Sequence, residues 1–141
     1  MYKKTIKYTD YNGVDREEDF YFNLTMAEMA ELELGTTGTF TAFVDKIIQA
    51  QDTPALIKMF KQIIALTYGE KDLDGRHFIK EDDDGHKLFN KFKQTEAYSV
   101  LYMELATDDK AASEFINGVM PREVQEEVAK EANEKLLAPA A

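Results

Sequence analysis

One stretch of the sequence, EEDFYFNLTMAEMAELEL at residues 17–34, changes from a strand pattern to a helix pattern within a single residue. Apolar side chains occupy alternate positions from Phe20 to Leu24, as in a strand with one buried face. Thr25 precedes Glu28 by three positions, which is the spacing of a capping box at a helix start. Leu24 and Met29 stand at the two positions of a hydrophobic staple. The junction therefore predicts a strand that leads directly into a helix over 26–34.

A first strand is predicted at residues 2–9, YKKTIKYT, because apolar and polar side chains alternate there as well. The apolar face holds Tyr2, Ile6 and Tyr8, and the polar face holds Lys3, Thr5, Lys7 and Thr9. We therefore expect this strand to rest one face on the core and to expose the other.

The link between the two strands, DYNGV at residues 10–14, decides their register. Asn12-Gly13 alone suggests a two-residue type I′ turn, but that turn would place the apolar residues of the two strands on opposite faces. We favour a type I turn over Tyr11-Asn12, with Gly13 left-handed in a bulge. The predicted register pairs Asp10 with Val14, Tyr2 with Phe22, and Lys7 with Glu17.

Helical periodicity marks the middle of the chain. After the break GTTG at residues 35–38, an amphipathic helix is predicted from Thr39. The next helix opens at Thr53-Pro54, where threonine serves as the cap and proline as the first helical residue, and it ends at Gly69. Residues 70–86 are rich in acids and glycine, and we interpret most of this stretch as loop.

Three further helical segments are predicted toward the C-terminus. The sequence KLFNKF indicates a helical turn or two, and a longer helix then starts at Gln94 or Thr95. Another helix is capped by Thr107 or Asp108 and ends at Gly118. One face of the longer helix carries Ala97, Tyr98, Leu101, Tyr102 and Leu105, and the following helix turns Phe115 and Ile116 inward.

Strands at the N-terminus followed by helices predict an α+β fold that is mostly α-helical. We expect an N-terminal β-hairpin at residues 2–24, packed on a bundle of about five or six helices that begin at residue 25. An isolated hairpin is marginal in water, so it must lie on the helices or add strands from another subunit. Residues 1–120 are predicted to form a single compact domain, and residues 121–141 a C-terminal helix with a frayed tail.

Composition argues against several classes of function. The 141 residues include 17 basic and 27 acidic side chains, and the formal net charge of −10 disfavours nucleic acid and anionic membranes. There is no cysteine, which excludes disulfides, thiolate zinc sites and a cysteine nucleophile. No apolar run approaches the ~18 residues of a membrane span, and no signal-peptide pattern is present. We expect a cytosolic protein.

The strongest candidate for a chemical site is the twelve-residue window from Glu70 to Glu81. It places Asp72, Asp74, Gly75 and Glu81 at positions three, five, six and twelve of an EF-hand loop. However, the first position is glutamate where aspartate is wanted, the eighth is His77 where an aliphatic residue is wanted, and no second loop exists. We therefore interpret the window as a solvated acidic turn, with a calcium-responsive binding module as the alternative.

The remaining candidates are weaker. His77 and His86 are the only histidines, and both lie in the polar segment, where they are able to join neighbouring aspartates in a transition-metal site of weak spacing. Lys3, Lys4 and Lys7 form a basic cluster that we interpret as a solvated strand face. No G-x-S-x-G, P-loop or H-E-x-x-H pattern occurs. We therefore predict no enzyme, no catalytic, cofactor-binding or metal residues, and a partner surface that the sequence does not identify.

Three segments carry a family resemblance. KYTDYNGVDREEDFYFNLT, YGEKDLDGRHFIK and QTEAYSVLYMELATDDKAASEFINGVMP resemble, in this order, the small tail assembly chaperones of long-tailed, siphovirus-type bacteriophages and prophages. The resemblance extends over residues 2–121. The segment EDDDGHKLFNKFK and the helix after Pro121 depart from the family pattern.

The resemblance implies a non-enzymatic protein of the host cytoplasm that is absent from the mature virion. Such chaperones bind the tape measure protein, keep it soluble and help to recruit tail tube subunits. A longer product made by ribosomal frameshifting is common in the family, and self-association through the last helix is a further hypothesis. The rival interpretation is a structural tail component, a tube or completion subunit that uses the free edge of the hairpin to form rings.

Overall fold

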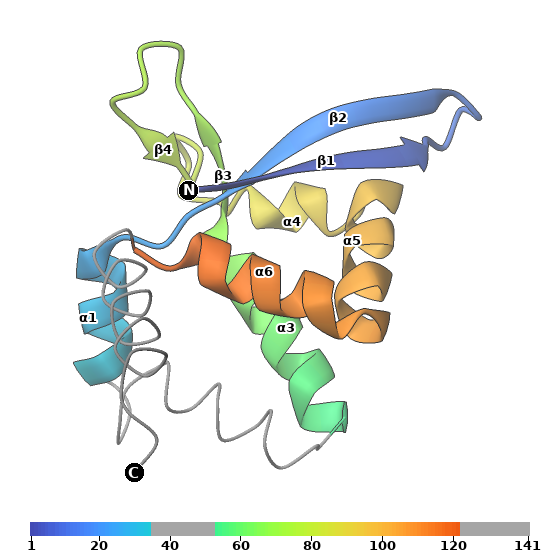
Figure 1. The fold of residues 1–141 in the computed structure, drawn as a ribbon. Coiled ribbons are helices and arrows are strands. Elements are labelled where there is room, and N and C mark those ends of the chain that lie inside the picture. Colours follow the sequence, from blue (N-terminus) through green and yellow to red (C-terminus); the bar gives the residue numbers. More distant parts are fainter. Residues whose placement is uncertain (35–52, 122–141) are drawn as a thin grey trace, which may run out of the picture.

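The computed structural model describes residues 1–34 and 53–121, which form a sheet with helices packed on one side of it (Figure 1). Within these ranges there are four antiparallel strands, in the order β1-β2-β3-β4, and five helices. The predicted α+β class is confirmed, although the sheet has two strands more than the predicted hairpin. The helix predicted from Thr39 and the C-terminal helix predicted after Pro121 lie outside the described residues.

The N-terminal hairpin has the predicted register. β1 (Tyr2–Thr9) pairs with β2 (Asp15–Phe22), and Tyr2 lies opposite Phe22 while Lys7 lies opposite Glu17. The Asp10 N–H donates to the Val14 carbonyl at 2.9 Å, and Gly13 has a φ of 78°. The three-residue loop with a left-handed glycine is therefore confirmed, and the apolar residues of both strands share one face.

The junction after β2 is also as predicted. Helix α1 (Met26–Leu34) begins with a capping box, in which Thr25 N–H donates to Glu28 Oε1 at 3.0 Å and Glu28 N–H donates to Thr25 Oγ1 at 3.1 Å. Leu24 and Met29, the two staple residues, are both buried. The capping box and the staple together fix the angle at which the chain leaves the sheet.

Helix α3 (Thr53–Thr67) runs directly into strand β3 (Tyr68–Lys71), which pairs with β2, and β4 (Phe78–Ile79) follows. The prediction that Gly69 ends the helix is wrong, because Gly69 lies inside β3. A Cβ there would come within 2.5 Å of Phe78 Cε1 and 2.7 Å of the Ile79 carbonyl oxygen. Glycine is therefore required by the close approach of β4, and not by the end of a helix.

Three helices complete the described chain: α4 (Phe89–Phe92), α5 (Glu96–Thr107) and α6 (Asp109–Val119). Of the alternative caps, the structure selects Thr95, whose side chain accepts from Tyr98 N–H, and Asp108, whose side chain accepts from the first turn of α6. The predicted end of the last helix at Gly118 is correct to within one residue, since α6 ends at Val119, but Gly118 does not have the positive φ of a left-handed cap. Gly118 lies within α6, where a Cβ would come within 2.5 Å of Tyr2 Cδ2.

Aromatic rings fill the space between the sheet and the helices. Phe22 is fully buried and its ring lies 5.3 Å from Phe115 and 6.0 Å from Phe92, measured between centroids. Tyr68 stacks on Phe92 with centroids 4.2 Å apart. Burial raises the pKa of Tyr68 to about 12. These rings join β2, β3, α4 and α6 in one core.

The segment after β2 forms backbone hydrogen bonds with the C-terminal ends of two helices. Asn23 N–H donates to the Thr67 carbonyl at the end of α3, and Leu24 N–H donates to the Val119 carbonyl at the end of α6, at 2.8 and 3.0 Å. Carbonyls at helix ends have no partner within the helix, so these bonds satisfy two of them. The link between β2 and α1 is therefore the point where both helices are anchored.

Candidate functional site

The acidic window from Glu70 to Glu81 is not a helix–loop–helix unit. β3 supplies its first residues, a turn follows, and β4 comes next, so strands flank the loop. Asp72 accepts from the backbone N–H of His77 at 3.1 Å and lies 2.7 Å from the Nδ1 of the same residue. Asp74 accepts from Arg76 N–H at 3.2 Å. These carboxylates close the turn, and the calcium-module alternative lacks the helices that an EF-hand requires.

Asp82 closes a second turn in the same way. Its Oδ1 accepts from the backbone N–H groups of Asp84 and His86, at 3.0 and 2.8 Å, and Gly85 has a φ of 81°. A bridge between Glu81 and Lys87 follows, so the stretch predicted as loop contains β-structure at both ends.

A shared tetrapeptide, Asp-x-(Asn/Asp)-Gly, builds the turns DYNG, DLDG and DDDG. In each one the carbonyl of the first aspartate accepts from the glycine N–H at 3.0 or 3.1 Å, and the glycine has positive φ. Backbone N–H groups of His77 and His86 hold the pKa of Asp72 and Asp82 below their usual value. The recurrence of this tetrapeptide is the sequence signal for the second hairpin, which strand and helix periodicity does not reveal.

The two histidines do come close to aspartates. The ligand atoms of Asp72, Asp74 and His77 lie within 4.8 Å of one another, and the same is true of Asp82, Asp84 and His86. The hydrogen bonds of the turns account for both arrangements, and both histidine side chains are about three-quarters exposed. The geometry therefore indicates ordered surface turns.

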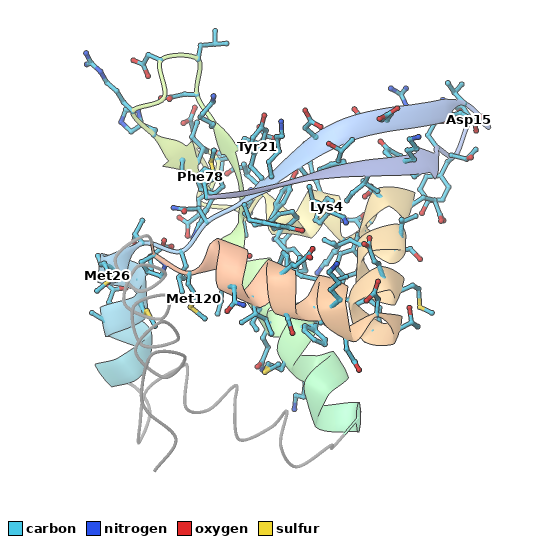
Figure 2. All side chains as sticks on the ribbon, in the orientation of Figure 1. Lys4, Asp15, Tyr21, Met26, Phe78 and Met120 are labelled. Carbon is cyan, nitrogen blue, oxygen red and sulfur yellow. The ribbon has the colours of Figure 1, made fainter. Side chains whose placement is uncertain are left out.

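The lysine cluster divides between the two faces of the sheet. Lys4 does not lie on the solvated face: its side chain is on the helix side of the hairpin, where Nζ lies 2.7 Å from Glu104 of α5 (Figure 2). Burial opposes the charge of Lys4, but the hydrogen bond with Glu104 raises its pKa overall. Lys3 and Lys7 are exposed on the outer face as predicted, and neither forms a salt bridge with any described residue.

The outer face of the hairpin is mostly polar and carries one aromatic residue, Tyr21, opposite Lys3. Thr5 donates to Asp19 at 2.6 Å and Thr9 donates to Asp15 at 2.9 Å, each across the two strands. These side chains and those of Lys3, Lys7 and Glu17 are exposed, whereas the opposite face is covered by helices (Figure 1). The hairpin therefore presents a charged, solvated surface on one side and the core on the other.

A shallow pocket of about 250 Å³ lies beside α5, lined by Lys61, Lys93, Tyr98 and Tyr102. The Tyr98 ring stands edge-on to Phe92, with centroids 5.7 Å apart, and lies 5.8 Å from the Tyr102 ring. Phe92 is buried in the core, so its contact with Tyr98 ties one side of the pocket to the core. The exposed lysines Lys61 and Lys93 stand at its rim.

The lining of this pocket combines two aromatic rings with two ammonium groups. Aromatic rings supply large apolar contact area, and lysines beside them attract acidic side chains. The sequence places Tyr98 and Tyr102 on the core face of a helix, and it gives no sign that their outer edges line a pocket with lysines from α3 and the segment after α4. The available signal is that tyrosine, unlike leucine, usually keeps one end at the surface.

Comparisons with known proteins identify the family. The family model described as phage tail assembly chaperone matches residues 1–140 of the chain. No curated protein and no solved structure matches it. Within residues 1–34 and 53–121, none of the helices combines the length and the apolar character that a membrane span needs. Because the match extends over nearly the whole sequence, the chain belongs to the phage tail assembly chaperone family.

Proposed function

We propose that the chain is a non-enzymatic chaperone that binds the tape measure protein, keeps it soluble during tail assembly and helps to recruit tail tube subunits. The observation that carries this proposal is the family match over residues 1–140. The protein acts in the host cytoplasm and is left out of the finished virion. It needs no cofactor for this role, because its work is to cover apolar surface on its partner.

The pocket beside α5 supports a contact with an amphipathic helix. Such helices dock through apolar side chains at positions i, i+3 or i+4, and i+7, which enter shallow apolar depressions. Tyr98 and Tyr102 offer one depression of this kind, and Lys61 and Lys93 stand where acidic residues of the incoming helix would pass. We assign this pocket to one helical segment of the tape measure protein.

Net charge supports the solubilising role. The chain carries a formal charge of −10, so each copy bound to a tape measure protein adds negative charge to the complex. Like charges keep such complexes apart in solution. A rival function, a structural tail subunit, differs in one observable: the protein would then be found in purified virions.

Coexpression with the tape measure protein of the same phage tests the proposal. The tape measure protein should stay in the soluble fraction and co-purify only when the chain is present. The double variant Lys61→Glu/Lys93→Glu should release most of it, because the acidic residues of the incoming helix would meet carboxylates.

The matched control is Lys71→Glu/Lys110→Glu, which makes the same change of charge at two exposed lysines outside the pocket. It should retain the tape measure protein as the unchanged chain does. Equal loss in both variants would show a general charge effect and would contradict the pocket assignment. A tape measure protein that is equally soluble without the chain would contradict the proposed function itself.

A further inference from the structure

The sheet has one long open edge. β1 is the first strand in the order β1-β2-β3-β4, and within the described parts of the chain no strand pairs with its outer side. It is eight residues long, whereas β4 at the other edge has two residues. Natural proteins protect sheet edges with short strands, prolines, bulges or charges, and β1 uses only charges, since it has neither proline nor bulge.

The backbone groups at this edge follow from the register. Asp10 N–H donates to Val14, which makes this a hydrogen-bonded pair. Because such pairs alternate along an antiparallel ladder, the even-numbered residues of β1 point their backbone groups toward β2. The N–H and C=O groups directed at the open edge therefore belong to Lys3, Thr5, Lys7 and Thr9.

The charges of β1 select the kind of strand that fits. β1 carries Lys3, Lys4 and Lys7 and no carboxylate. Lys4 is held by Glu104, but the exposed ammonium groups of Lys3 and Lys7 form no salt bridge within the described residues. A second copy of β1 would bring four unpaired lysines together on the outer face, Lys3 and Lys7 from each copy, which is unfavourable. An incoming strand with acids on the outer face would pair with Lys3 and Lys7 instead.

On the inner side of this edge, two exposed apolar residues of α5 lie beside the Lys4–Glu104 ion pair. On α5, Tyr98 lies toward α4, which packs under β2 through the contact of Phe92 with Phe20. Val100 and Met103, which are 40% and 55% exposed, lie on the opposite flank of α5 from Tyr98. Since the Tyr98 flank faces α4 and β2, this flank faces the side where the sheet ends at β1. Side chains of an added strand that point inward would cover these two residues.

We propose that the open edge of β1 binds an extended segment of a partner protein, in which acidic side chains alternate with apolar ones, as a fifth strand of the sheet. The acidic side chains lie beside Lys3 and Lys7, and the apolar ones lie over Val100 and Met103. Main-chain hydrogen bonds supply affinity and the alternation supplies specificity. This surface is separate from the pocket of Tyr98, and the inference does not depend on tape measure binding.

A synthetic peptide of sequence TEVEVEVT, blocked at both ends, is the probe. Two control peptides are TKVKVKVT, with reversed charge, and TEVEVEVT with alternate backbone nitrogens methylated along one edge. TEVEVEVT is titrated into the isotope-labelled full chain, and the amide signals are followed by nuclear magnetic resonance. The amide signals of Lys3, Thr5, Lys7 and Thr9 should shift. The reversed and methylated peptides should bind at least about tenfold more weakly.

Variants of the chain complete the test. Lys3→Glu/Lys7→Glu should weaken TEVEVEVT binding at least about tenfold, whereas Lys71→Glu/Lys110→Glu, with the same change of net charge, should leave it unchanged. Thr5→Pro removes one outward N–H, which is tolerated on edge strands, and should weaken binding while the β1–β2 amide signals persist. The methylated peptide probes the same bond without altering the protein.

Four results would overturn the inference: no shift at millimolar peptide, shifts confined to other surfaces, equal binding of TKVKVKVT, or equal loss in the control variant. Sedimentation of the free chain gives a fifth. A dimer that Thr5→Pro dissociates would show that a second copy occupies the edge. None of these results affects tape measure solubility in coexpression, so failure here is distinguishable from failure of the proposed function.

Discussion

The substitution Gly118→Ala tests how the N-terminal strand and the last described helix fit together. Gly118 lies inside α6, and the position that a new Cβ would take is 2.5 Å from Tyr2 Cδ2. In an ordinary exposed helix the same substitution would be stabilising, because alanine is the better helix former. The sign of the effect therefore depends on whether the Tyr2 ring blocks the methyl group.

Two opposing effects set the magnitude. Alanine favours the helix over glycine by about 1 kcal/mol, whereas forcing a methyl group into filled space costs about 1–3 kcal/mol. Rotation of the ring does not remove the clash, since Tyr2 Cγ and Cβ also lie 3.0 and 3.2 Å from the new position. The ring is also held edge-on against buried Phe115, with centroids 5.5 Å apart. We expect Gly118→Ala to lower the free energy of unfolding by about 1 kcal/mol.

A double-mutant cycle with Tyr2→Ala separates the two effects. Without the ring, two of the three close contacts disappear, and Gly118→Ala should then raise the free energy of unfolding by up to ~1 kcal/mol. The expected coupling between the two positions is about 1–2 kcal/mol. Equilibrium urea unfolding of all four proteins, followed by far-ultraviolet circular dichroism, measures it. If Gly118→Ala changes stability equally in both backgrounds, the Tyr2 contact does not explain the glycine and the reasoning is wrong.

Two further predictions concern the second hairpin and the link to α1. Gly69→Ala should lower the free energy of unfolding by about 2–3 kcal/mol, more than Gly118→Ala, because the new methyl group would meet the Ile79 backbone oxygen, which cannot rotate away. Urea unfolding measures this loss, and a free energy of unfolding within about 0.5 kcal/mol of that of the unchanged chain would contradict the prediction. For Glu28, burial opposes ionisation, but the Lys80 salt bridge and the Thr25 N–H lower its pKa below 4.5 overall. Its stabilising effect is therefore present above the unfolded pKa and is lost as pH falls through the folded pKa, so the stability difference between the unchanged chain and Glu28→Gln should shrink from about pH 6 to about pH 3. A constant difference over that range would refute the assignment.

Local signals in the sequence predicted the N-terminal third of the fold. The register of the hairpin followed from the requirement that the apolar residues of both strands share one face, with Gly13 in the turn between them. The start of α1 followed from the spacing of Thr25 and Glu28. Each of these signals involves residues that are close together in the chain. The α+β class followed from the order of the periodic segments. In these places short-range pattern and tertiary structure agree.

Long-range contacts explain what the sequence did not predict. Glycine is common at helix ends, but Gly69 admits the Phe78 ring from the neighbouring strand β4, and Gly118 admits the Tyr2 ring from β1. β3 and β4 are too short to show alternation, and β3 forms because Phe22 and Tyr21 offer it an edge. Alternation with Tyr2 and Ile6 places Lys4 on the inner face of β1, but its partner Glu104 lies 100 positions away, where no local pattern points to it.

The pocket beside α5 shows the same limit for the candidate site. Tyr98 and Tyr102 belong to one predicted helix face, but Lys61 lies on α3 and Lys93 is the residue that follows α4. No spacing rule joins these three segments. The motif spacing points instead to Asp72 and His77, whose side chains close a turn.

The hydrogen bond from the Leu24 N–H to the Val119 carbonyl has a consequence for synthesis of the protein. On the ribosome the hairpin emerges early, but the helix that receives Leu24 and buries Phe22 is among the last described elements to appear. Until α6 leaves the exit tunnel, the inner face of the hairpin has no complete cover, and exposed apolar strands are prone to aggregate. A member of a chaperone family thus passes through a vulnerable stage of its own, with the charged outer face of the hairpin as its protection in the meantime.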